Sequence, residues 1–441
     1  MEPITFEKIN QWQKTYEQNT LQKVMRHAVY NNALELCVSV QENMTKNQNH
    51  FSVEIDTLKA SDQLTSGRCW IFAGLNLLRE DVAKQLNLEQ FELSQNYIAF
   101  YDKLEKVNTF LELAISMSEA PIDDRTFVWL VTSGIQDGGQ WDMFVNLVKK
   151  YGVVPKDMMP ETYQSSNTAT MNMLINTRLR RFAQEVRNLA ALEKQDEILS
   201  LKEDVLQKMY GFLCTCFGIP PKRFRFAYAD RNGHVHHLKE MTPQEFYQNQ
   251  VHLDLDNYVS LIHAPTKDKP FHEVFQVKYL AHADGMAVRY LNLPLKEFKQ
   301  VIITQLKDGR LVWFGSDCNS FNDKKGGFWD DQSFDYTSAF EIDFAIDKET
   351  ALDMRDSTMN HAMVISGVDL IDDQPLKWKI ENSWGDASGK NGYFIASDSW
   401  FDRFVYQAVI HKKYLTEKQL ADLEKKPKLL EPWDPMGTLA R

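Results

Sequence analysis

Apolar residues recur at helical spacing in the first half of the chain, and in the second half they form short runs typical of strands. Residues 69–80 predict an apolar helix directly after a Ser-Gly turn, and residues 124–151 predict a loop with a glycine pair followed by a helix. Residues 22–40 predict a helix with one buried stripe, formed by Val24, Met25, Val29, Ala33, Leu34 and Leu36.

The middle of the chain predicts an inserted helical hairpin. Residues 171–217 are rich in charge, contain no Pro and have no Gly before Gly211, which favours long helices with a solvated face. After Pro220-Pro221 the period shifts towards two, and Asn232-Gly233 is typical of a hairpin turn.

The second half of the chain predicts strands. The strand-like runs are residues 257–264, 301–306, 311–315, 361–368, 377–382, 392–396 and 404–410. A helix-rich front followed by a strand-rich back indicates an α+β protein with two lobes.

Composition narrows the class of protein. The 441 residues carry 50 Lys plus Arg against 61 Asp plus Glu, a net charge of −11 that argues against nucleic-acid binding. No run of 18 apolar residues predicts a membrane span, and the first residues do not form a signal peptide. Five cysteines, an odd and sparse set, favour reduced thiols, so we expect a cytoplasmic protein.

One cysteine lies where a helix start favours a nucleophile. Cys69 falls in the first turn of the predicted helix, where free backbone N–H groups, the helix dipole and the adjacent Arg68 favour a thiolate. Taken alone, a structural buried cysteine is the simpler interpretation. Gln63, six residues earlier, offers an amide that can stabilise an oxyanion.

The whole segment QLTSGRCWIFA, residues 63–73, resembles the nucleophile segment of papain-like cysteine peptidases, in particular the bleomycin hydrolase and aminopeptidase C family. Secreted relatives have C-G-[SA]-C-[WY] here, and Ser66 replaces the first of those cysteines. The expected partners follow in order, His361 within MNHAMVISGVDL and Asn382 within KIENSWGDASGKNGYF.

The resemblance implies a fold and a set of roles. The fold would be the papain-like two-lobed α+β fold, with a helical lobe, a β-barrel-like lobe, large helical insertions and a C-terminal arm. Cys69 would be the nucleophile, His361 the general acid and base, and Asn382 the residue that orients His361. Gln63 and the Cys69 N–H would hold the oxyanion, and Trp384 would line the substrate cleft and shield the His–Asn bond from water.

The chain is longer than this chemistry needs. His361 follows Cys69 by 292 residues, about 140–160 more than the roughly 130–150 of the papain pattern. We therefore predict one peptidase domain over residues 1–441, with an inserted helical segment at about 160–220 and a C-terminal arm at about 412–441. The resemblance implies a barrel-shaped homohexamer with active sites facing an internal channel.

The C-terminal segment EPWDPMGTLAR predicts the specificity. Pro432 and Pro435 stiffen it, and Trp433 and Met436 can pin it to the body. In the family this tail lies in the cleft, where its terminal carboxylate faces the substrate's α-ammonium. The binding carboxylate would belong to Arg441, or to Ala440 if Arg441 is removed, and the sequence leaves this open.

The sequence thus predicts a cysteine aminopeptidase that acts on peptides through a thioester. An endopeptidase of the same family is the alternative. No metal or organic cofactor is expected, because His234, His236 and His237 lie beside a hairpin turn without further ligands at suitable spacing. Membrane partners are not expected either.

Overall fold

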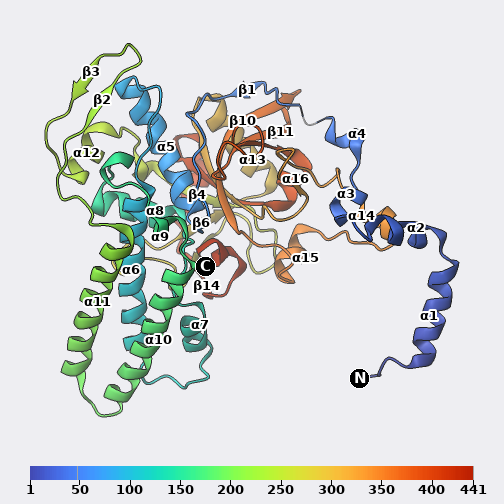
Figure 1. The fold of residues 1–441 in the computed structure, drawn as a ribbon, viewed down its shortest axis with the longest axis horizontal. Coiled ribbons are helices and arrows are strands. Elements are labelled where there is room, and N and C mark those ends of the chain that lie inside the picture. Colours follow the sequence, from blue (N-terminus) through green and yellow to red (C-terminus); the bar gives the residue numbers. More distant parts are fainter. Residues whose placement is uncertain (47, 441) are drawn as a thin grey trace.

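The computed structural model describes residues 1–46 and 48–440, except for the Ala440 side chain. It has two lobes, one built from helices and the other around a mixed sheet, as expected for an α+β fold (Figure 1). The helical lobe contains α5 (Cys69–Leu86), α6 (Gln95–Ser116), α7 (Arg125–Ser133), α8 (Trp141–Tyr151), α9 (Tyr163–Ser166), α10 (Ala169–Ala190), α11 (Gln195–Phe217), α12 (Pro243–Gln250) and the 3₁₀ turns η1 (Lys156–Met158) and η2 (Leu255–Asn257).

The sheet lobe is one 12-stranded mixed sheet, in which His361 opens a central strand. The order is β14-β5-β6-β4-β13-β7-β10-β11-β12-β9-β8, with β1 also paired to β10. The strands are β1 (Val53–Glu54), β4 (Tyr258–Ile262), β5 (Val274–Val277), β6 (Arg289–Asn292), β7 (Val312–Ser316), β8 (Asn322–Asp323), β9 (Phe328–Trp329), β10 (His361–Ile371), β11 (Gln374–Glu381), β12 (Tyr393–Ser397), β13 (Val405–His411) and β14 (Lys428–Leu430).

Shorter elements surround this sheet or lie outside it. They are α13 (Leu295–Lys307), α14 (Tyr336–Phe340), α15 (Lys348–Asp353), α16 (Asp398–Phe404), α17 (Glu417–Leu423), η3 (Lys412–Tyr414), η4 (Pro435–Ala440), and a separate hairpin of β2 (Ala227–Ala229) and β3 (Val235–His237). The hairpin turns at Asn232-Gly233, where Gly233 has φ of +80°, as the sequence predicts.

Helix α5 joins the two lobes. It packs against β10 and β7 on one side and against α6 and α8 on the other. Thirteen of its residues are buried, so only a helix that is apolar almost all round fits here. It ends at Asn87, whose left-handed conformation satisfies the last carbonyls. The position of Cys69 is therefore fixed by the cores of both lobes.

The inserted helices form a long bundle. Helices α10 and α11 are the two helices predicted over 171–217, and they pack against α6 and against each other (Figure 1). Each buries one face only, as the solvated-face pattern indicates. The division of the chain into a single domain with insertions stays a prediction.

Two sequence predictions of local structure are wrong. Residues 301–306 belong to helix α13, because Phe298, Val301, Ile302 and Leu306 lie at helical spacing and are all buried against the sheet lobe. Residues 124–151 contain the helix α7 where a loop was expected, before the predicted helix α8.

The stripe predicted over residues 22–40 is not buried. This segment forms part of an N-terminal arm with α1 (Phe6–Gln18), α2 (Thr20–Val29), α3 (Leu34–Cys37) and α4 (Gln41–Met44), which extends away from the body (Figure 1). None of these four helices has a buried residue, and Val24 and Leu36 are 58% and 73% exposed.

Candidate active site

Cys69 is the first residue of α5 and lies at the junction of the two lobes. Its Sγ accepts a hydrogen bond from the backbone N–H of Ala362 at 3.4 Å, and its side chain is almost completely buried. Ala362 follows His361 directly, so the first residues of β10 lie next to the thiol. The sequence separation of 292 residues is thus closed by the packing of α5 on β10.

His361 is held by Asn382. The two residues lie at the same end of the paired strands β10 and β11, and His361 Nε2 donates to Asn382 Oδ1 at 2.8 Å. The same amide oxygen accepts from the backbone N–H of Ser383 at 2.8 Å, which fixes its orientation. Because Nε2 carries the proton in this bond, Nδ1 is the basic ring nitrogen and is left for the thiol.

Trp384 covers the imidazole. Its ring stacks on His361 with centroids 5.1 Å apart and planes inclined by 28°. Trp329 and Phe394 pack around Trp384 in turn. The indole therefore lies over the ring that bonds to Asn382, and its shielding of this bond from water stays a prediction.

Gln63 is fixed by the loop that follows Asn382. Ser383 Oγ donates to Gln63 Oε1 at 2.6 Å, and the Gln63 backbone N–H donates to the Ser383 carbonyl at 2.9 Å. The Gln63 amide nitrogen donates one of its two hydrogens to the Ser66 carbonyl. Its second hydrogen is available to a bound oxyanion.

Burial controls the charges of the pair. It raises the pKa of Cys69 to about 11, against the lowering effect of the N–H groups of Ala362 and Trp70. It lowers the pKa of His361 to about 4, although the bond to Asn382 acts in the opposite direction. A lone charge on either group is therefore disfavoured. Proton transfer from Sγ to the imidazole would create two opposite charges, whose mutual attraction compensates part of the cost of burying each.

Arg68 does not supply the positive charge that the sequence predicts for the thiolate. Its guanidinium forms two bonds to Glu161, at 3.1 and 2.9 Å, and Nε donates to Ser66 Oγ. The ion pair neutralises the charge and ties the loop before Cys69 to the start of the inserted helices.

Asp137 is a residue that the sequence analysis missed. Its carboxylate accepts from the Gly67 backbone N–H at 2.9 Å and pairs with the buried Lys103 at 2.6 Å. Although burial acts to raise the pKa of Asp137, the Lys103 ammonium and hydrogen bonds from Thr168 and Asn172 hold it well below its usual range. The sequence feature that could have pointed to Asp137 is the adjacent pair Gly138-Gly139. Trp70 packs where a side chain at position 139 would be, so this loop approaches the start of α5 closely.

The C-terminal arm lies close to β7 and to the start of β10. Thr438 Oγ1 donates to the Met359 carbonyl at 2.7 Å, and Tyr290 Oη donates to the Met436 carbonyl at 3.0 Å. Leu439 is buried beside Gly315. The expected role of the Ala440 and Arg441 carboxylates falls on atoms outside the described residues and stays a prediction.

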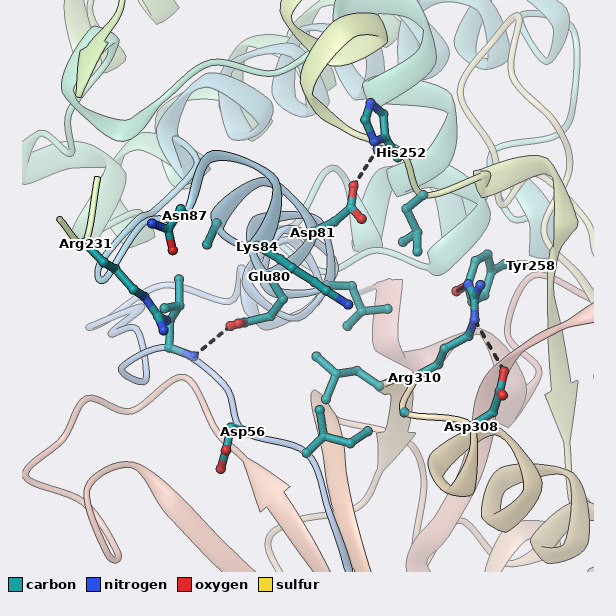
Figure 2. Close-up of a pocket in the computed structure, with 17 residues that line it drawn as sticks. Asp56, Glu80, Asp81, Lys84, Asn87, Arg231, His252, Tyr258, Asp308 and Arg310 are labelled. Atoms are coloured by element: carbon teal, nitrogen blue, oxygen red, sulfur yellow. Dashed lines mark hydrogen bonds and ion pairs between the residues drawn. The ribbon is translucent and has the colours of Figure 1, made fainter. Parts of the chain in front are cut away.

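A separate cavity of about 610 Å³ lies along the C-terminal half of α5, at the end of the helix opposite to Cys69 (Figure 2). Most of its charged groups bond one another or the backbone, as Glu80 does to the Leu58 N–H and Asp308 to Arg310. It therefore has no part in the arrangement around Cys69.

Among the residues that the structure describes, no group of three or more His, Cys, Asp or Glu has the arrangement of a metal site. Within the same residues, no helix has the length and apolar character needed to cross a membrane.

The chain is similar to known proteins along nearly its whole length. The model of the Peptidase C1-like family matches residues 3–437. Aminopeptidase C of Lactobacillus delbrueckii subsp. lactis is 47% identical over 88% of each chain, and bleomycin hydrolase of Gallus gallus is 36% identical over 94% of this chain and 93% of its own. The crystal structure of pepw from Lactobacillus rhamnosis has a TM-score of 0.97 at 42% identity and covers 99% of both chains.

Proposed function

The chain belongs to the Peptidase C1-like family, and from this premise we propose that it is a cysteine aminopeptidase that removes N-terminal residues from peptides. The fold is the papain-like α+β fold. The observation that carries the proposal is the contact of Cys69 Sγ with the Ala362 N–H while Asn382 holds the neighbouring imidazole.

The proposed reaction has two halves. Cys69 transfers its proton to His361 Nδ1, and the thiolate attacks the carbonyl carbon of the first peptide bond. The C–N bond then breaks, the imidazolium gives its proton to the leaving amine, and a thioester remains. A water molecule, deprotonated by the neutral His361, hydrolyses the thioester and restores the thiol.

Gln63 and the Cys69 backbone N–H form the proposed oxyanion hole. The Gln63 amide is fixed through Ser383, so its donor is in position before substrate binds. A preorganised donor of this kind contributes about 3–4 kcal/mol to stabilisation of the transition state in related chemistry.

The C-terminal arm supports the choice of an aminopeptidase. Its last described turn, η4, lies beside β7 and bonds to Met359, two residues before His361, and this position supports an arm that limits the substrate residues before the scissile bond. We propose that the terminal carboxylate, of Arg441 or of Ala440 after removal of Arg441, binds the α-ammonium of the substrate.

The nucleophile is tested by Cys69→Ala, which we expect to abolish turnover of amino-acid arylamides. Cys216→Ala is the matched control, because Cys216 is a free thiol on α11 far along the chain from the site. Retained turnover in Cys69→Ala would refute the assignment. Alkylation of the native protein at neutral pH should label Cys69 if the thiol is reactive.

The alternative is an endopeptidase with the same chemistry. A dipeptide arylamide with a free amino group and its N-acetylated twin distinguish the two functions. We expect efficient cleavage of the free-amino substrate only. Efficient cleavage of the blocked substrate would favour the endopeptidase.

We further propose a cytoplasmic homohexamer without nucleic-acid or membrane partners. Free thiols at all five cysteines support a reducing compartment. The charge of −11 disfavours nucleic acid, and the exposed apolar side chains of the N-terminal arm offer surface for association between copies. Light scattering tests the hexamer.

A further inference from the structure

The two sides of the Cys69–His361 pair carry different groups. In the sheet, β10 lies between β7 and β11. The C-terminal arm contacts Gly315 of β7 and Met359, so it lies on the β7 side. The turn between β8 and β9, residues 324–327, lies on the other side, beyond β11 and β12. If the amino end of a substrate lies at the arm, its leaving part extends towards this turn.

Lys324 is the charged group of this turn that reaches the site. Its Nζ lies 5.1 Å from the ring centroid of Trp384, and the same indole stacks on His361. A cation held over an indole in this way gains attraction from the ring while it stays hydrated. The Lys324 side chain is exposed, and no ion pair found among the described residues includes it.

The backbone that carries Lys324 is fixed. Asp323 Oδ1 accepts from the N–H groups of Lys325 and Gly326 at 3.0 and 2.8 Å. The Gly327 N–H donates to the Asp323 carbonyl at 2.8 Å, and Gly327 has φ of +75°. The Lys324 carbonyl accepts from the Gly389 N–H. The ammonium is thus presented from a defined turn rather than from a loose loop.

We propose that Lys324 binds a carboxylate of the leaving part of the substrate and makes the enzyme prefer peptides that carry one. The inference rests on the proposed function, because His361 must protonate a leaving amine beside Trp384. In a dipeptide the carboxylate is the free C-terminus of the second residue. In longer peptides it is the side chain of Asp or Glu at the corresponding place.

The experiment compares pairs of substrates that differ by one charge. Ala-Ala against Ala-Ala-amide tests the terminal carboxylate, and Ala-Glu-amide against Ala-Gln-amide tests the side chain. For each pair the readout is the ratio of kcat/KM values, which cancels any change common to both substrates. The variants are Lys324→Gln and, as a control of equal charge and exposure on the same turn, Lys325→Gln.

We expect the ratio for at least one pair to exceed one in the unmodified enzyme, by about twofold to fivefold for a single exposed charge pair. Lys324→Gln should bring it close to one, and Lys325→Gln should keep it. Added salt should lower it in the unmodified enzyme. Whichever pair responds identifies the source of the carboxylate.

Two outcomes overturn the inference. The first is a kcat/KM ratio of one in the unmodified enzyme for both substrate pairs. The second is an equal fall of this ratio in Lys324→Gln and Lys325→Gln, which would indicate that the positive charge of the surface as a whole, and not Lys324, attracts the carboxylate. Failure of the proposed function is distinguishable, because a neutral alanine arylamide would then not be cleaved by the unmodified enzyme at all.

Discussion

At the scale of single residues, burial rather than neighbouring charge sets the behaviour of Cys69 and His361. The sequence places Arg68 next to Cys69, and that proximity suggested a stabilised thiolate. In the fold the guanidinium faces Glu161, so its charge does not reach the sulfur unopposed. Adjacent positions along a chain do not predict which way two side chains point, and this part of the site required the structure.

The lowered pKa of His361 predicts the acid limb of the pH profile. Because burial lowers this pKa from 6.5 to about 4, the imidazole stays neutral and basic as the pH falls through 6. With an alanine arylamide, whose α-amino group is protonated below about pH 7, kcat/KM should therefore stay level between about pH 7 and 6 and decline only below about pH 5. Circular dichroism at each pH checks that the fold persists. An acid limb centred at 6.5 would contradict the prediction.

At the scale of elements, α5 is locked to β11 by one buried ion pair. Arg79 Nη2 and Asn76 Nδ2 both donate to Glu381 Oε1 at 2.7 Å, and Glu381 directly precedes Asn382. Burial raises the pKa of Glu381 to about 7 even with Arg79 beside it. The helix that begins with Cys69 and the strand that leads to Asn382 are thus held in a fixed position relative to each other.

Arg79→Met is predicted to destabilise the fold by about 3–5 kcal/mol at pH 8, because it leaves the Glu381 carboxylate buried without a cation. The loss should be smaller at pH 5, where Glu381 takes up a proton more readily than in the unfolded chain, whose carboxyl titrates lower. Urea unfolding at both pH values measures this.

Arg181→Met is the matched control for that experiment. Arg181 forms an exposed pair with Glu185 within α10, so we expect a loss below about 0.5 kcal/mol at either pH. A loss in Arg79→Met no larger than in Arg181→Met would show that the buried pair does not hold α5 to the sheet.

Element types were predictable where pattern and environment agreed. The hairpin turn at Asn232-Gly233 and the two inserted helices follow from local signals, and Cys69 does start its helix. The strand prediction for residues 301–306 failed because Val and Ile favour strands, whereas burial of one face of α13 decides the structure.

The three central residues of the candidate site, Cys69, His361 and Asn382, were found through family motifs. Asp137 and Lys324 have no such motif, and only the fold brings them to the site.

At the scale of the whole molecule, helix α1 of the N-terminal arm presents apolar side chains that are exposed in the described structure. Phe6, Ile9 and Trp12 follow one another at three-residue spacing on α1 and are 80%, 42% and 54% exposed. Single exposed apolar residues are ordinary, but a stripe on a projecting helix is typical of an interface. We infer that the occupant is a second copy of the chain, in line with the proposed hexamer.

The double variant Phe6→Glu/Trp12→Glu is predicted to lower the mass of the assembly in light scattering, because it places charge in the apolar contact. The double variant Gln11→Glu/Thr15→Glu adds the same charge at exposed polar positions of α1 and should keep the mass. An unchanged mass in both would exclude α1 from the interface. Circular dichroism verifies that both variants are folded.

The C-terminal arm is the part of the chain to which we assign the selection of substrates with a free amino end. Its turn η4 is held by bonds from Thr438 to Met359 and from Tyr290 to Met436, so the arm is fixed close to the start of β10. Deletion of the last four residues removes Thr438 and the buried Leu439 and moves the terminal carboxylate back to Gly437, while Met436 and its bond to Tyr290 remain. The change therefore removes side chains from the β7 side of the site and leaves Cys69 unaltered.

We predict that this deletion shifts the preference of the enzyme towards internal bonds. The rate on the N-acetylated peptide should rise relative to its free-amino twin, by about tenfold or more if the terminal carboxylate binds the ammonium through a charge-assisted bond. Arg441 alone is removed in a second variant. If Ala440 supplies the working carboxylate, that variant should keep the unmodified ratio, and if Arg441 supplies it, the ratio should shift. An unchanged ratio after the four-residue deletion would show that selection for a free amino end is built into the cleft and not into the arm.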